Sequence, residues 1–280
     1  MELRGGAVAT DVRYATHPHE LERLRPDELR ARFVVGGLFE EGAVHYALSM
    51  SDRLLVGGAV PAGATLELSA PAELSSEQLL DRRELALVCL SGSGEVEVGG
   101  ATFGLRAEDI LYAGQGAGPV RVAGDAAFYL VSAPAHRPLP TTLARKEDAE
   151  THVIGDAAVA SLRTLRKYLH EDGVATCELA VGITTLAEGS VWNTMPCHTH
   201  ERRTEIYLYF GLPADERVVH LCGRPEATRS LVLGDREAVI SPPWSIHTGA
   251  GTHPYRFVWS TGGENLAYND MDPVPTHSLR

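Results

Sequence analysis

The sequence predicts an all-β protein with a few short helices. Apolar and polar residues alternate over many short runs, and glycine (28 residues) and proline (16 residues) separate these runs. Long apolar patterns with the 3.6-residue period of a helix are scarce. Short strands joined by tight turns are therefore expected through most of the chain.

A hairpin is the clearest single element. The alternating runs 95–98 and 101–105 flank Gly99 and Gly100, and two glycines between such runs favour a two-residue hairpin turn. Similar runs predict strands at 86–90, 128–132, 177–186, 206–210, 217–222, 238–241 and 255–259. The helix candidates are residues 19–32 and 157–168.

The 280 residues fit two domains, because a domain usually has about 100 to 200 residues. A proline-rich stretch at 134–140 and a charged stretch at 146–150 separate two halves, so we place the domains at residues 1–145 and 146–280. Residues 81–88 (DRRELALV) resemble residues 201–208 (ERRTEIYL). This similarity indicates a degenerate internal repeat.

The composition excludes several classes of partner. The formal net charge of −12 argues against nonspecific binding to nucleic acid or to anionic membranes. No apolar run is long enough to span a membrane, and the N-terminal residues lack the pattern of a signal peptide. A cytoplasmic protein is expected, in which the four cysteines, without any Cys-x-x-Cys pair, are reduced thiols.

Three histidines and a glutamate indicate a metal site. His198 and His200 share one face of an extended strand, Glu205 follows beyond a turn, and His247 comes from a separate segment. Imidazole and carboxylate ligands suit Zn²⁺, Mn²⁺, Fe²⁺, Ni²⁺ or Co²⁺ better than Ca²⁺ or Mg²⁺. Cys197 adjoins His198, but strand alternation turns it away, so we interpret it as a packing thiol.

One metal per chain is expected, in the second half. The stretch of the first half that corresponds to the His-x-His segment, residues 70–80, contains no histidine. Residues 1–145 are therefore predicted to bind no metal.

Three segments resemble the 5-keto-4-deoxyuronate isomerases (4-deoxy-L-threo-5-hexosulose-uronate ketol-isomerases) of the cupin superfamily. They are residues 192–203 (WNTMPCHTHERR), residues 240–249 (ISPPWSIHTG), and residues 263–265 (GEN) with 270–272 (DMD). Weaker similarity runs through the first half, and Pro243 departs from the expected pattern. The resemblance implies a bicupin of two jelly-roll β-barrels, with zinc held by His198, His200, Glu205 and His247.

The resemblance also implies a reaction, a location and an assembly. Members convert 5-dehydro-4-deoxy-D-glucuronate to 3-deoxy-D-glycero-2,5-hexodiulosonate in the cytoplasm, during breakdown of pectin or other uronate polymers, and they are homo-hexamers. In this reaction a divalent metal polarises the carbonyl and stabilises an enediolate. We therefore expect a zinc-dependent isomerase that acts on a small uronate and needs no organic cofactor.

The predicted site also includes a base and a cation for the substrate. Glu264, Asp270 and Asp272 are candidates for the catalytic base, since they lie in a polar C-terminal segment that resembles the family. The substrate is a carboxylate, so a local cation should bind it, and the candidates are Arg163, Lys167, Arg202 and Arg203. On a strand Arg202 and Arg203 face opposite ways, so at most one of them should enter the barrel.

Two other functions fit the same ligands. A cupin dioxygenase binds Fe²⁺ through three histidines and one glutamate, and its substrates react with O₂. A non-catalytic sugar-binding bicupin holds a structural metal, and four protein ligands complete a tetrahedral zinc shell.

Overall fold

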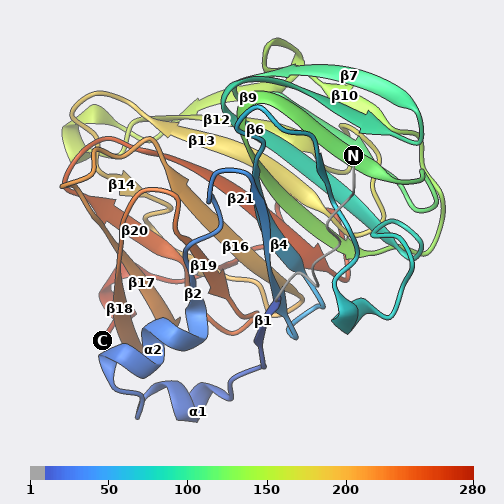
Figure 1. Cartoon of the computed structure of the whole chain (residues 1–280). Coiled ribbons are helices and arrows are strands. Elements are labelled where there is room, and N and C mark those ends of the chain that lie inside the picture. The colour runs from blue at the N-terminus through green and yellow to red at the C-terminus, as the bar shows by residue number, and fades with distance from the viewer. Residues whose placement is uncertain (1–9) are drawn as a thin grey trace. The chain divides into compact units, whose positions relative to one another are not determined.

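The computed structural model describes residues 10–280, which form two compact units (Figure 1). The first unit contains residues 10–12, 37–49 and 53–145, and the second contains residues 13–36, 50–52 and 146–280. Strands make up most of the regular structure in both units, which confirms the prediction of a mainly β protein.

The first unit is built on a nine-stranded sheet whose order is β1-β3-β4-β9-β6-β8-β10, with β5 paired to β9 and β7 paired to β6. These strands are β1 (Thr10–Arg13), β3 (Ala43–Ser49), β4 (Leu55–Val60), β5 (Leu66–Glu67), β6 (Arg83–Val98), β7 (Ala101–Arg106), β8 (Ile110–Ala113), β9 (Val120–Pro134) and β10 (Thr142–Ala144). The predicted hairpin is confirmed, because Val98 pairs with Ala101 across Gly99 and Gly100. A 3-10 turn, η1, covers Ala72–Leu74.

The second unit contains a seven-stranded sheet of order β11-β12-β13-β21-β16-β19-β2. Its strands are β2 (Val34–Val35), β11 (Glu150–Ile154), β12 (Arg163–Leu169), β13 (Ala180–Leu186), β16 (Arg203–Phe210), β19 (Ala238–Ser241) and β21 (Arg256–Gly263). A four-stranded sheet of order β14-β20-β17-β18 contains β14 (Trp192–Asn193), β17 (Val218–Arg224), β18 (Ala227–Leu233) and β20 (Thr248–Gly251). The short strands β15 (His198–Thr199) and β22 (Asp272–Pro273) pair with each other.

The two larger sheets of the second unit share one apolar core. Tyr207 and Phe257 of the seven-stranded sheet belong to the same buried cluster as Val218 and Leu231 of the four-stranded sheet. Helices α1 (Pro18–Leu21) and α2 (Pro26–Phe33) add apolar side chains to this cluster and lie against β17, β18 and β19 (Figure 1). The remaining 3-10 turns are η2 (Lys146–Asp148), η3 (Ala157–Val159) and η4 (Thr276–Ser278).

Both helix predictions need correction. The single helix expected at 19–32 is split into α1 and α2, because Pro26 opens a new helix and keeps Arg25 in an extended conformation. The helix expected at 157–168 is wrong. Residues 157–159 form only a 3-10 turn, and Arg163–Leu169 is strand β12, which gains ladder hydrogen bonds from both β11 and β13.

The repeat seen in the sequence corresponds to a repeated strand arrangement. β6 begins at Arg83 and lies between β9 and β8, and β16 begins at Arg203 and lies between β21 and β19. Aligning the two arginines places Leu85 in the register position of Glu205. A leucine cannot bind a metal, so the two copies differ at this position in their chemistry.

Among residues 10–280, no helix has the length and apolar character that crossing a bilayer requires.

Candidate metal centre and adjoining cavity

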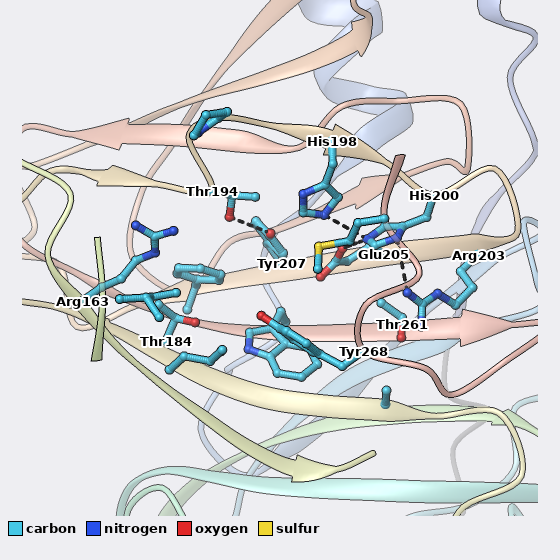
Figure 2. A pocket seen from close by; sticks show the side chains of 17 residues that line it. Arg163, Thr184, Thr194, His198, His200, Arg203, Glu205, Tyr207, Thr261 and Tyr268 are labelled. Atoms are coloured by element: carbon cyan, nitrogen blue, oxygen red, sulfur yellow. Dashed lines mark hydrogen bonds and ion pairs between the residues drawn. The ribbon is translucent and has the colours of Figure 1, made fainter. Parts of the chain in front are cut away.

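Four side chains of the second unit converge on one point. His198 lies on β15, His200 follows in the next turn, Glu205 lies on β16, and His247 precedes β20. One nitrogen or carboxylate oxygen from each side chain lies within 4.8 Å of the other three, and the group could hold a metal ion. Figure 2 shows His198, His200 and Glu205 directed at one another.

The distances within this group suit a small divalent cation. The Nε2 atom of His198 lies 3.1 Å from that of His200 and 3.0 Å from that of His247, and the Glu205 carboxylate lies 2.8 Å from His247 and 2.9 Å from His200. Tetrahedral ligands about 2.0 to 2.1 Å from a zinc ion are separated by about 3.3 Å. The donor set and its spacing therefore fit the predicted type of metal.

The protonation states expected of His198 and Glu205 also suit a metal. Burial, with the neighbouring His247, lowers the pKa of His198 to about 2, so this imidazole is neutral and its lone pair is available. Burial alone would raise the pKa of Glu205, but His247 and His200, whose ring nitrogens lie close to its carboxylate, hold the pKa well below its usual value. Neutral imidazoles and an ionised carboxylate are the forms that bind metals.

A segment near the C-terminus fixes the orientation of His200. The Nδ1–H group of His200 donates to the main-chain carbonyl of Asp270, which directs the Nε2 lone pair toward the other ligands. Arg203 donates to the same carbonyl at 2.9 Å and to the carbonyl of Ala267 at 2.9 Å. Arg202 binds the carboxylates of Asp270 and Asp272, so two adjacent arginines fasten residues 267–272 beside the metal ligands.

A cavity of about 240 Å³ adjoins the ligand group. A cavity of this volume can hold a small molecule of the size of one monosaccharide. Tyr207, Phe257, Trp259 and Tyr268 form much of its wall. Aromatic side chains together with arginine, threonine and histidine side chains are typical of a site for a small polar molecule.

The polar side chains of the cavity wall are spread from one end of the cavity to the other. Arg163 lies at the opposite end of the drawn cavity from His198 and His200, and Tyr207 lies between them (Figure 2). Burial, with the nearby Glu205, raises the pKa of Tyr207 well above its usual value, so its hydroxyl stays protonated. Tyr207 is two residues beyond Glu205 on β16, and strand alternation therefore gives both side chains the same face.

Comparison with known proteins identifies the family. The chain matches the KduI/IolB family over residues 36–278. It belongs to that family.

Relatives in this family are similar over nearly their whole length. The chain is 48% identical over 278 residues to the 4-deoxy-L-threo-5-hexosulose-uronate ketol-isomerase of Kineococcus radiotolerans, covering 96% of this chain and all of the relative. It is 45% identical over 275 residues to the enzyme of that name from Shouchella clausii, with the same coverage. A solved structure of an IolB-like protein from Salmonella typhimurium is similar in fold, with a TM-score of 0.65 at 18% identity over 77% of this chain and 84% of that chain.

The four predicted cationic residues of this KduI/IolB protein lie in different surroundings. Arg163 and Arg203 line the cavity. Arg202 is turned away from it and pairs with acids of the C-terminal segment. Lys167 is outside the cavity lining, where its ammonium group binds Glu150 at 2.7 Å and lies 4.9 Å from the centre of the Tyr268 ring.

The three predicted base candidates lie outside the cavity lining. The Asp270 carboxylate binds Arg202 and Asn265, and the hydrogen bond from Arg202 is the main reason that its pKa is lowered to about 2. Asp272 binds Arg202 at 2.8 Å, and the main-chain N–H of Glu264 donates to the carbonyl of Arg202. Among residues 10–280, Glu205 is the one carboxylate that lines the cavity. That Glu264, Asp270 or Asp272 is the catalytic base therefore stays a prediction, and their positions outside the cavity lining argue against it.

Two further side chains of the cavity wall could not be predicted from the sequence. Tyr268 and Met271 line the cavity from the segment that the two arginines fasten. No strand period governs this loop, and its contacts connect residues about 70 positions apart. Cys197, as a packing thiol should be, is buried beside Ile246 and Val274.

Proposed function

We propose that this protein is a zinc-dependent ketol-isomerase that converts 5-dehydro-4-deoxy-D-glucuronate to 3-deoxy-D-glycero-2,5-hexodiulosonate during breakdown of pectin and related uronates. The observation that carries the proposal is the convergence of His198, His200, Glu205 and His247 at one end of a monosaccharide-sized cavity. Relatives 45% to 48% identical to the chain bear the name of this ketol-isomerase, which supports the same substrate.

The substrate's two ends suit the two ends of the cavity. The carboxylate is the anionic end, and the Arg163 guanidinium is a matching bidentate donor on the cavity wall. The aldehyde and its neighbouring hydroxyl then lie toward the three histidines and Glu205. When bound there, a divalent metal would supply a Lewis acid that polarises the carbonyl group.

The chain's own groups support a proton transfer without net redox change. The aromatic side chains of the wall would place apolar groups beside the reacting carbons, and electrostatic interactions with a developing charge are stronger in such surroundings than in water. The hydroxyl of Tyr207 is available as a hydrogen-bond donor beside the ligand group. Asp270 and Arg203 hold His200 in the tautomer that leaves Nε2 free for the metal.

The organisation of the chain is part of the proposal. We infer a bicupin in which residues 1–145 contain a cupin-like domain without a metal and residues 146–280 form the metal-binding domain, to whose compact unit residues 13–36 and 50–52 also belong. The Leu85 that occupies the register position of Glu205 supports this difference. A cytoplasmic homo-oligomer, with the six subunits implied by the family resemblance, completes the proposal.

The test is to follow the reaction by NMR in deuterated water before and after chelation. The purified protein should convert the substrate, chelation should abolish conversion, and Zn²⁺ should restore it, with one solvent deuterium in the product. Conversion that survives complete metal removal would leave the isomerase but make the metal structural.

The same sample distinguishes the two other functions. O₂ consumption by an iron-loaded sample would support the dioxygenase. A metal-loaded, folded protein that binds the sugar acid but neither isomerises it nor consumes O₂ would support the non-catalytic binding protein. Either result would overturn the isomerase proposal.

A further inference from the structure

Thr194 has a backbone conformation that threonine rarely adopts. Its φ is +46°, in the left-handed region, where a β-branched side chain is strained. Such strain persists only where the surrounding structure imposes it, and it is concentrated at functional sites. Thr194 lines the cavity, which raises the question of what its side chain does there.

The side chain of Thr194 contacts Tyr207. Its hydroxyl oxygen lies 3.0 Å from the phenol oxygen of Tyr207, and Figure 2 shows this hydrogen bond at the cavity wall. The Tyr207 ring is held by Phe257, 4.6 Å away between ring centres, and by the edge of His247, 5.4 Å away. With its ring fixed, the phenol has one remaining freedom, the direction of its O–H bond.

The next tyrosine on the same face provides a comparison. Tyr209 is fully buried, its hydroxyl lies 2.8 Å from Nδ1 of His220, and it does not line the cavity. Tyr207 instead lies at the cavity wall, and Thr194 is its hydrogen-bond partner. If the Thr194 hydroxyl donates to the phenol oxygen, the phenol's own proton is free to point into the cavity.

We propose that Thr194 is a positioning residue that orients the Tyr207 hydroxyl, and that Tyr207 donates a hydrogen bond to a substrate oxygen near the metal ligands. This inference rests on the proposed ketol-isomerase function. The oxygen concerned is the one that gains negative charge as the adjacent C–H proton leaves. A donor placed in advance stabilises this charge more than the starting state, so it acts on kcat rather than on KM.

The test compares four variants of the zinc-loaded protein. Y207F removes the donor and should lower kcat about 100-fold, the usual effect of losing one such donor. T194V keeps the shape and the backbone strain but removes the hydroxyl, and should lower kcat roughly 10-fold, at the lower end of the effects seen when a supporting partner is lost. T194S keeps the hydroxyl and should retain most of the activity, and Y209F removes the same atom from the neighbouring tyrosine and should leave kcat unchanged.

The double variant provides the decisive measurement. In the Y207F background, T194V should have no further effect on kcat, because Thr194 acts only through the phenol. Zinc content and thermal unfolding are measured for every variant, so that a loss of metal or of folding is recognised. The inference would be overturned if the decreases in kcat caused by T194V and Y207F multiply in the double variant. It would also be overturned if T194V has the wild-type kcat, or if the substitutions change KM alone. A wild-type protein without turnover would overturn the proposed function as well.

Discussion

Arg203 and Arg202 are adjacent residues with different surroundings. The Arg203 side chain is 2% exposed and its donors satisfy the carbonyls of Ala267 and Asp270, whereas the Arg202 side chain is 35% exposed and pairs with carboxylates. Removing a buried donor leaves its acceptors unsatisfied, whereas an ion pair that water reaches contributes little to stability. Arg203 and Arg202 therefore form a matched pair: substituting Arg203 tests whether it keeps the metal ligand His200 in its orientation, and substituting Arg202 is the control.

We predict that R203M weakens zinc binding about 10- to 100-fold, the range expected when a group that orients a metal ligand is lost. The Asp270 carbonyl would no longer be fixed as acceptor for His200. R202M should change zinc affinity less than threefold, in line with an ion pair that is partly exposed to water. Competition with a chromophoric chelator measures both affinities, and equal effects of the two substitutions would contradict this account.

His220 is a buried histidine that lies outside the metal group. Burial lowers its pKa to about 3, and the hydroxyl of Tyr209 is its hydrogen-bond partner. Below pH 6.5 the unfolded chain gains a proton at this residue and the folded chain does not, so stability falls as the pH falls from 6.5 toward 3.

H220Q should remove this dependence. At pH 5, about 1.5 pH units below the unfolded value, His220 accounts for a loss of about 2 kcal/mol relative to pH 7. Urea unfolding of both proteins at pH 7 and pH 5 measures the difference. If the variant loses as much stability as the wild type between these pH values, His220 is not the group responsible.

At the scale of single residues, the sequence predicted the ligand group and missed most of the cavity wall. His198, His200 and Glu205 could be found because they are close in sequence, His247 because it is an isolated histidine on a later segment, and the family resemblance supported the same four residues. Thr194 and Tyr268 lie in loops, where no periodicity predicts the direction of a side chain. Only the folded sheet brings these residues to one cavity.

Among the strands, β13 shows how a missing side chain shapes the cavity. A Cβ atom on Gly182 would lie 2.1 Å from Cζ2 of Trp259 and 2.4 Å from the carbonyl of Arg166. Gly182 is paired with Trp259 across β13 and β21, so the indole ring lies over the glycine. A side chain at residue 182 would push the ring toward the cavity that it lines.

G182A should therefore raise KM more than it lowers kcat, and should destabilise the protein by about 1 to 3 kcal/mol, as overpacking does. G104A is the control, because a Cβ atom on Gly104 would meet no atom within 4 Å. Steady-state kinetics and thermal unfolding of the two variants measure both effects. Unchanged KM in G182A would show that the indole does not move into the cavity.

Among the secondary-structure elements, the strands were more predictable from the sequence than the helices. The strands β16, β17, β19 and β21 were predicted because each contains a short apolar run between turn residues. Every residue of β16 and β19 is buried, whereas β17 alternates between buried and exposed positions. β12 was mistaken for a helix because its sequence, RTLRKYL, has no clear alternation. Its conformation is determined by pairing with β11 and β13, which local sequence does not reveal.

Across the whole molecule, the metal would join segments that are distant in sequence. Its ligands come from β15, the following turn, β16 and the loop before β20. A ligand that binds only the folded state stabilises it by about 2.7 kcal/mol at a concentration 100 times its Kd. For a unit of this size each kcal/mol raises Tm by roughly 2 to 4 °C.

Zinc should therefore raise the unfolding temperature of the chelated protein by about 5 to 10 °C. E205Q, which replaces the ionised ligand by a neutral amide of similar shape, should lose most of this increase. Calorimetry with and without zinc measures the shift, and an equal shift in E205Q would show that zinc acts elsewhere.

The left-handed backbone of Thr194 has a consequence for evolution in the laboratory. Asparagine and glycine tolerate this conformation better than threonine, so either residue should relieve strain of the order of 1 kcal/mol. Neither carries the hydroxyl that contacts Tyr207. A library randomised at residue 194 and sorted for heat resistance should therefore be enriched in asparagine and glycine, and the same library sorted for growth on the uronate should retain threonine and serine.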